Sequence, residues 1–141
     1  REEENMTQRT FDAVTKNLDQ VLAFLDSQLE SWGCPLRVQL QLDVAVEELF
    51  VNIASYAYGE KTGTAEIAMD LLPGQIIEIT FRDSGIPYNP LEKPDPDVTK
   101  PAEEREIGGL GIYIVKKSMD EVLYRHEDGQ NILTIRKALS E

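Results

Sequence analysis

Glu48 and Asn52 are the first two residues along the chain whose types and spacing could support chemistry together. They are four residues apart in a helical pattern, so their side chains share one face, at the edge of the apolar arc. A carboxylate can polarise a nucleophile, and carboxylate and amide oxygens are ligands that a hard cation accepts. The pair is therefore a candidate acid–base and cation site. The alternative is an ordinary pair of polar residues at the boundary of a core.

Three glycines, Gly108, Gly109 and Gly111, precede an apolar run that can form a helix. Because glycine has no Cβ, each can take positive φ and let its backbone N–H approach a ligand. A helix N-terminus behind such a loop favours negative charge. The pattern predicts a phosphate cradle, and its alternative is a tight loop that packs a helix against a sheet.

Asp83 ends a stretch in which apolar and polar residues alternate, and it has the same parity as Phe81. If the strand continues, the carboxylate faces the buried side of the sheet. A carboxylate in that place is satisfied by backbone donors or is reserved for a donor on a ligand. Ser84 and Gly85 then allow the chain to leave the strand sharply.

These residues need helices and strands to position them, and the periodicities predict both. Apolar residues at helical spacing predict a helix from about Thr15 to Gly33, a second over about 36–58, and roughly three turns after the glycines. Alternation predicts a weak edge strand at 6–12, a hairpin of strands near 64–71 and 77–81, and final strands near 121–126 and 131–137. Asp128-Gly129, between the last two, is a strong hairpin-turn signal.

Residues 86–107 show little periodicity and hold five of the seven prolines. A segment of this length inside a compact domain is typical of a lid or a binding loop, with a plain linker as the alternative.

The composition limits what the chain can be. With 141 residues and 41% hydrophobic content, residues 1–141 fit a single globular domain. The net charge of −12 disfavours nucleic acid as a direct partner and suits a basic protein partner. Cys34 is the sole cysteine, the N-terminus is acidic, and no apolar run is long enough for a bilayer, so we expect a cytoplasmic protein without a membrane segment. His126, the lone histidine, is expected on the surface.

Three motifs in this order resemble the GHKL (Bergerat-fold) ATP-binding domain: a helix with Glu48-Leu-Phe-Val-Asn52, a strand ending in Asp83-Ser-Gly85, and Gly109-Leu-Gly111 opening a helix after a lid. Within that superfamily the chain is most similar to the small bacterial anti-sigma factor serine-protein kinases of the RsbW/SpoIIAB type, on Val46-Glu-Glu-Leu-Phe-Val-Asn-Ile-Ala-Ser-Tyr-Ala-Tyr58.

The resemblance implies an α+β fold, a two-layer sandwich in which helices cover one face of a mixed sheet, with ATP between the helices and a lid at 86–107. It assigns Glu48 as the general base and Asn52 as a Mg²⁺ ligand. Asp83 would accept from the adenine amino group, with Gly85 permitting close approach. The remaining nucleotide contacts that it implies are Gly108, Gly109, Leu110 and Gly111 at the phosphates, Thr134 near the base, and Arg105 as the arginine nearest the glycine motif.

The resemblance also implies a function. The chain would be an ATP- and Mg²⁺-dependent serine-protein kinase and anti-sigma factor in transcription regulation. It would phosphorylate a STAS-like antagonist protein, bind a sigma factor, and form a homodimer as family members commonly do. Two alternatives stay open: a nucleotide-gated protein-binding module without kinase activity, and a detached histidine-kinase-type ATPase domain. One departure stands out, because Pro87 occupies the place where many relatives have a second glycine.

Overall fold

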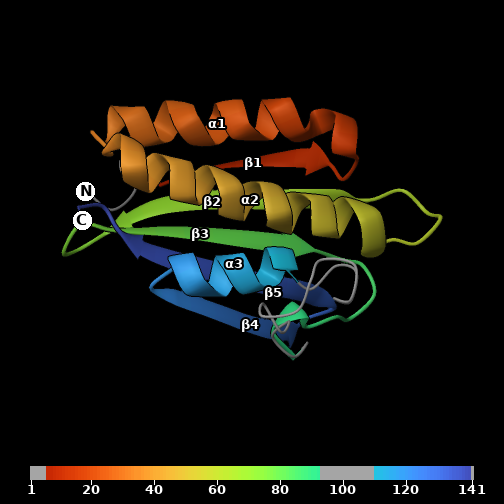
Figure 1. Cartoon of the computed structure of the whole chain (residues 1–141). Helices are drawn as coiled ribbons and strands as arrows, with labels where there is room; N and C mark the ends of the chain where they lie inside the picture. The colour runs from red at the N-terminus through yellow and green to blue at the C-terminus, as the bar shows by residue number, and fades with distance from the viewer. Residues whose placement is uncertain (1–5, 93–109, 141) are drawn as a thin grey trace, which may run out of the picture.

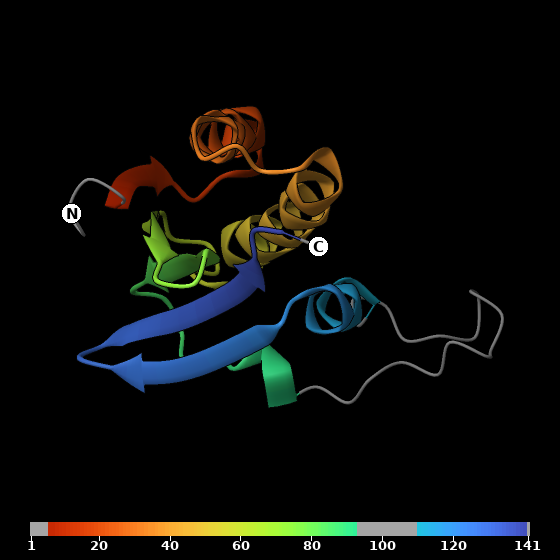
Figure 2. The ribbon, with the colours of Figure 1, turned by 90° about the vertical axis from the view of Figure 1, so that its left-hand side faces the viewer.

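The computed structural model describes residues 6–92 and 110–140, which form one five-stranded sheet covered on one face by helices (Figures 1 and 2). The strand order is β1-β2-β3-β5-β4. The strands are β1 (Met6–Asp12), β2 (Thr64–Leu72), β3 (Ile76–Asp83), β4 (Glu121–Glu127) and β5 (Gln130–Ala138). The helices are α1 (Leu18–Ser31), α2 (Leu36–Tyr56) and α3 (Leu110–Ser118), with short 3₁₀ turns η2 (Thr15–Asn17) and η3 (Pro90–Glu92).

The α+β fold with helices on one face is confirmed, but the described sheet is antiparallel rather than mixed. All four strand pairs are antiparallel. β4 runs in the same direction as β3, as a crossover through a helix requires, yet β5 returns between them and pairs with both. The hairpin of β4 and β5 therefore removes the one parallel pairing that the crossover would have produced.

The core lies between the sheet and the helix layer, in which α2 packs against both α1 and α3. Strand β3 alternates as expected, since Ile77, Ile79, Phe81 and Asp83 are buried while the residues between them are not. Helix α2 buries the arc that includes Leu42, Ala45, Val46, Leu49 and Phe50. No helix in the described part of the chain is long and apolar enough to cross a membrane.

The chain reverses direction where the sequence predicted it would. Gly33 has a φ of 72° and follows the end of α1, which places a left-handed residue where a helix commonly stops. Asp128 and Gly129 both have positive φ, at 55° and 77°, as a two-residue hairpin turn of type I′ requires.

The turn after β3 packs directly on the end of α2. Ile86 donates its N–H to the carbonyl oxygen of Ala57 at 2.7 Å. A Cβ built at Gly85 would lie 2.1 Å from the same carbonyl oxygen. The glycine is therefore required by close approach to the protein's own backbone, and this contact fixes the end of β3 against the end of α2.

Helices α1 and α2 meet at a pair of carboxyl groups, Asp26 and Asp43. Their Oδ1 atoms are buried without another hydrogen-bond partner in the part of the chain that the structure describes. Burial raises the pKa of Asp43 from its ordinary value of 3.8 to about 7, reinforced by the hydrogen bond to Asp26 and by the negative charges of Asp26, Glu30 and Glu47. Two carboxyl oxygens can hydrogen-bond only when one carries a proton, so the pair holds a proton between the helices.

Substituting Gly85 by alanine should destabilise the fold. The added methyl group collides with the backbone of Ala57, which cannot move aside as the end of a flexible side chain can. We expect a loss of about 1–3 kcal/mol in the free energy of unfolding, measured by urea denaturation. Ser84→Ala, at the exposed neighbouring position, is the control and should change stability little. A Gly85→Ala variant as stable as the wild type would contradict the close packing.

The proton held by Asp26 and Asp43 predicts a pH dependence of stability. The folded chain binds one more proton than the unfolded chain between about pH 4 and 7, so stability should fall as pH rises through this range and level off above it.

Asp43→Asn replaces the shared proton by an amide donor and should flatten this dependence. At pH 8 we expect the variant to gain about 1 kcal/mol, a value reduced for solvent screening because both residues are only partly buried. Denaturation at pH 5 and pH 8 measures it, with Glu60→Gln in the exposed loop after α2 as the control. An unchanged slope in Asp43→Asn would show that the pair does not hold the proton.

Candidate functional site

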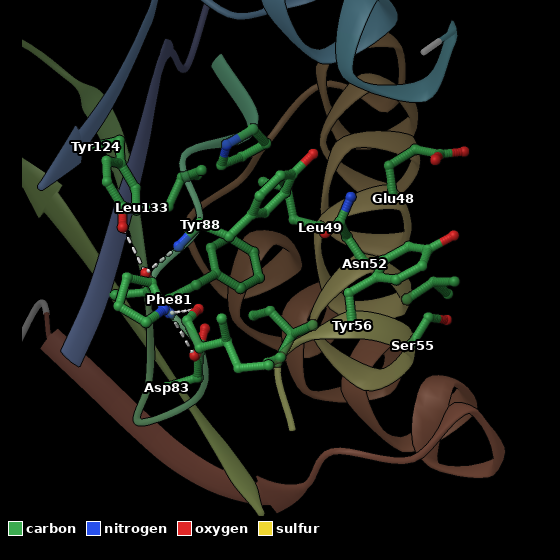
Figure 3. Close-up of a pocket in the computed structure, with 17 residues that line it drawn as sticks. Glu48, Leu49, Asn52, Ser55, Tyr56, Phe81, Asp83, Tyr88, Tyr124 and Leu133 are labelled. Carbon is green, nitrogen blue, oxygen red and sulfur yellow. Dashed lines mark hydrogen bonds between the residues drawn. The ribbon is translucent and has the colours of Figure 1, made fainter. Parts of the chain in front are cut away.

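A cavity of about 530 Å³ lies between helix α2 and the sheet. Figure 3 shows Glu48, Asn52 and Tyr56 along the helix side, and Asp83, Tyr124 and Leu133 on the strand side. Apolar side chains form much of the wall, with a small number of polar groups among them. The lining residues are Glu48, Leu49, Val51, Asn52, Ile53, Ser55, Tyr56, Ala57, Phe81, Asp83, Ile86, Pro87, Tyr88, Pro90, Tyr124, Asn131 and Leu133. Apolar walls with few polar groups are typical of small-molecule sites.

The structure brings Glu48 and Asn52 together on the cavity side of α2, as their spacing predicts. Glu48 also lies against the start of α3, because a Cβ built at Gly111 would be 2.0 Å from its Oε2. A side chain at residue 111 would therefore displace the Glu48 carboxylate from its present position. The Glu48 carboxylate therefore lies beside the N-terminal turn of α3, where helix amides favour negative charge.

Asp83 lies at the strand end of the cavity and is 6% exposed. Its Oδ1 accepts two hydrogen bonds at 2.9 Å, from the backbone N–H of Gly85 and from Nδ2 of Asn131. A buried carboxylate needs such donors, since without them its desolvation would be costly. The prediction that Asp83 faces the buried side of the sheet is confirmed.

Asn131 is a site residue that the sequence analysis missed. It is 7% exposed and its amide group bonds to Asp83 and also to Ile86, Tyr88 and Tyr124. The signal that would have found it is the pairing register, in which Asp83 and Asn131 are direct neighbours on β3 and β5. That register follows from the tertiary fold and cannot be read from either strand alone.

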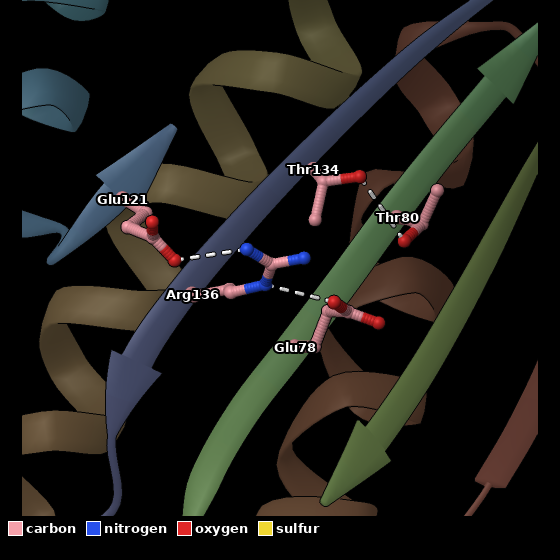
Figure 4. Close-up of polar contacts among 5 residues, drawn as sticks. All are labelled: Glu78, Thr80, Glu121, Thr134 and Arg136. Carbon is pink, nitrogen blue, oxygen red and sulfur yellow. Dashed lines mark hydrogen bonds and ion pairs between the residues drawn. The ribbon is translucent and has the colours of Figure 1, made fainter. Parts of the chain in front are cut away.

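Thr134 does not lie in the cavity, which corrects the expectation that it lies near the base. Asn131, Leu133 and Ile135 face the helices, so Thr134 faces the opposite side of the sheet. Figure 4 shows it beside Thr80, with the two hydroxyl oxygens 3.4 Å apart. Arg136 lies on the same outer face and pairs with Glu78 and Glu121, each at 2.9 Å. This face carries cross-strand polar pairs and lies on the opposite side of the sheet from the cavity.

The glycine motif differs in part from the sequence prediction. Gly111 is the second residue of α3, and it is not among the described glycines that have positive φ. Its lack of a side chain instead leaves room for the carboxylate of Glu48. Leu110 begins α3 and is 40% exposed. Gly108, Gly109 and Arg105 lie outside the described residues, as does the lid from residue 93 onward.

The cavity residues fit a nucleotide with a divalent cation. The apolar walls suit a flat base beside the buried carboxylate of Asp83, while Glu48 and Asn52 suit the phosphate end near α3. None of the described lining residues is cationic. The described residues also contain no cluster of three metal-ligating side chains. A Mg²⁺ ion held by one protein oxygen and by the phosphates would supply the positive charge that the described lining lacks. It would also need no cluster of three protein ligands, since this ion commonly keeps few of them.

Comparison with known proteins agrees with this geometry. Residues 11–137 match the model of the family described as the histidine kinase-like ATPase domain. Over 96 residues the chain is 31% identical to the serine-protein kinase RsbW of Bacillus thuringiensis strain Al Hakam and to that of Bacillus cereus strain AH820. The aligned region is 65% of this chain, and it spans only 59% of the length of these curated relatives.

Solved structures show the same fold at lower identity. The RsbU and RsbW domains of Rv1364c from Mycobacterium tuberculosis align with a TM-score of 0.70 at 17% identity, over 96% of this chain and 33% of that one. The blue-light activated histidine kinase EL346 of Erythrobacter litoralis aligns with a TM-score of 0.58 at 20% identity, over 76% of this chain and 32% of that one. With the family model covering residues 11–137, the chain belongs to the histidine kinase-like ATPase domain family.

Proposed function

We propose that this chain binds Mg²⁺-ATP and acts as a serine-protein kinase and anti-sigma factor in the cytoplasm. The observation that carries the proposal is the cavity itself, with a buried carboxylate, Asp83, at one end and Glu48 and Asn52 together at the other. The serine-protein kinases RsbW among its relatives support the same reaction.

Each residue has a role that its position supports. Asp83 would accept a hydrogen bond from the base, and Asn52 would supply an oxygen ligand to Mg²⁺. Glu48, beside the start of α3, would take the proton from the attacking serine hydroxyl. The cation offsets the phosphate charge, which no described lining side chain can do. Gly108, Gly109, Leu110 and Arg105 remain our candidates for further phosphate contacts.

The partners we propose are a STAS-like antagonist protein as the phosphate acceptor and a sigma factor bound in its place, with the chain as a homodimer. The bound nucleotide would then decide whether the chain binds the antagonist or the sigma factor, so nucleotide binding and partner binding would be coupled. The net charge of −12 suits partners with basic contact surfaces.

A second candidate is a nucleotide-gated binding module without phosphate transfer. The exposed apolar residues Leu36, Leu40 and Val44 favour it, because they recur every four residues along the outer face of α2. Such a stripe is typical of a protein contact surface. A detached histidine-kinase-type domain would instead require a phosphoacceptor histidine in another protein, and acid-labile phosphate on the acceptor would identify it.

Mg²⁺-ATP should stabilise the folded protein by mass action and so raise its melting temperature. The gain in the free energy of unfolding should be about 2.7 kcal/mol at a ligand concentration a hundredfold above the dissociation constant. Asp83→Asn replaces the carboxylate that would accept a hydrogen bond from the base by a neutral amide. The substitution should weaken ATP binding about tenfold or more. Differential scanning fluorimetry with a nucleotide titration measures both effects.

Asp70→Asn is the matched control, since Asp70 has the opposite parity to the buried residues of β2. It should leave the ATP-induced shift unchanged, and EDTA should reduce the shift in the wild type. The absence of any shift at millimolar Mg²⁺-ATP would reject the nucleotide site.

Glu48→Gln should slow phosphate transfer to a STAS-like acceptor by about 10²–10⁴-fold, because the amide cannot take the serine proton. ATP binding should be retained. Transfer is measured with labelled ATP as acid-stable phosphate on serine. Glu47→Gln, the exposed neighbour on α2, is the control and should transfer at the wild-type rate. ATP binding without transfer to any acceptor by the wild type would favour the binding module.

A further inference from the structure

Helix α2 carries a stripe of apolar side chains on the face that points away from the core. Leu36, Leu40 and Val44 are 68%, 54% and 44% exposed and recur every four residues. Residues four apart share one face of a helix, so the three side chains form a ridge about 12 Å long. The core uses a different arc of the same helix, which includes Leu42 and Leu49. The stripe is therefore available to another molecule.

A row of carboxyl groups follows the seam between α1 and α2. The two helices run antiparallel there, because Gln39 Nε2 donates to Glu30 Oε2 at 3.4 Å and Asp43 shares a hydrogen bond with Asp26. Glu47 is also close enough for its charge to act on Asp43. We call this set the acidic row, and its members are Asp26 and Glu30 on α1 and Asp43 and Glu47 on α2.

The acidic row and the apolar stripe lie side by side. Asp43 follows Leu40 by three residues and Glu47 follows Val44 by three, and residues at this spacing are neighbours on a helix surface. On the other side of α2 lies α3, whose last turn carries two lysines (Figure 1). The acidic side of the stripe is therefore the side that faces α1.

Charge decides which kind of molecule fits this surface. A second copy of the chain would bring another acidic row and another net charge of −12 to the contact, and like charges oppose association. Lysine or arginine side chains would instead be attracted to the row. A helix with apolar residues every three to four positions and basic residues along one flank matches both the stripe and the row.

We propose that the outer face of α2 is a docking surface for a basic amphipathic helix of a partner protein. The apolar face of that helix covers Leu36, Leu40 and Val44, and its basic flank lies over the acidic row. This contact needs no nucleotide and is separate from the phosphate transfer proposed above.

The proton held by Asp26 and Asp43 gives the contact a signature in pH. Burial, the hydrogen bond to Asp26 and the charges of Asp26, Glu30 and Glu47 raise the pKa of Asp43 to about 7. Cys34, between the two helices, has its own pKa raised by burial and by the charge of Asp43. A cation over the row favours the ionised pair, so docking should release the proton. Affinity should therefore rise with pH through about 7 and level off above it.

The probe is a labelled synthetic peptide of about 18 residues made of leucine, lysine and alanine, with leucines on one face and lysines along one flank. Its binding to the protein without nucleotide is measured by fluorescence anisotropy. One control peptide has glutamate in place of every lysine. A second has the same composition in scrambled order, which measures plain attraction to an acidic protein.

Two variants remove part of the stripe, Leu40→Ser and Leu36→Ser. Both positions are exposed, so the fold should be kept, and circular dichroism checks it. Leu123→Ser is the matched control, since Leu123 is 45% exposed but lies on strand β4 at the edge of the sheet.

The wild type and Leu123→Ser should bind the lysine peptide equally, and Leu40→Ser should bind it about tenfold more weakly. The glutamate and scrambled peptides should bind about tenfold more weakly than the lysine peptide. Raising the pH from about 6 to 8 should tighten binding to the wild type about threefold or more. Asp43→Asn has no shared proton to release and should bind with little dependence on pH.

Equal binding by the wild type and both stripe variants, or of the ordered and scrambled peptides, would overturn the proposal, because net charge alone would explain it. Binding that needs Leu40 but ignores pH would overturn the placement of the basic flank over the acidic row. No binding at millimolar peptide would reject the surface altogether. A wild-type dimer that dissociates in Leu40→Ser, seen by sedimentation, would assign the stripe to a second copy. None of these results depends on whether ATP binds.

Discussion

The carboxylate of Asp83 must be satisfied inside a largely apolar wall, because a buried charge without donors would cost several kcal/mol. Two N–H groups meet this requirement, one from Gly85 in the turn after β3 and one from Asn131 on the neighbouring strand. The first needs the sharp turn and the second needs the β3–β5 register. The turn after β3 and the side chain of Asn131, which also bonds to Tyr88 and Tyr124, both take part in satisfying this one group.

Two glycines lie close against helix α2, one against its backbone and one against a side chain. At its end Gly85 approaches the carbonyl of Ala57, and further back Gly111 approaches the carboxylate of Glu48. The two glycines bring the turn after β3 and the start of α3 against the same helix. The cavity lies along the stretch of α2 between these contacts, so the approach of Gly85 to the backbone helps to set its walls together with side-chain packing.

The charge of the molecule constrains how it can hold a phosphate chain. The chain carries a net charge of −12, and the described cavity lining has acidic residues but no cationic one. Within the described part of the chain, attraction would come from a bound cation and from backbone amides at the start of α3, both of which act over short distances. This is the physical reason why we expect nucleotide binding to depend strongly on Mg²⁺.

The sequence by itself determined the helices, the strands and the side of each element on which Glu48, Asn52 and Asp83 lie. Those features depend on periodicities of 3.6 and 2 residues, which are local. The tertiary structure alone decided that Asn131 lies beside Asp83 in the cavity wall, and that Asp26 meets Asp43. It also placed Gly111 inside a helix and inserted β5 between β3 and β4. These outcomes depend on strand register and helix approach, which are set by contacts between residues far apart in the chain, and no local pattern encodes them.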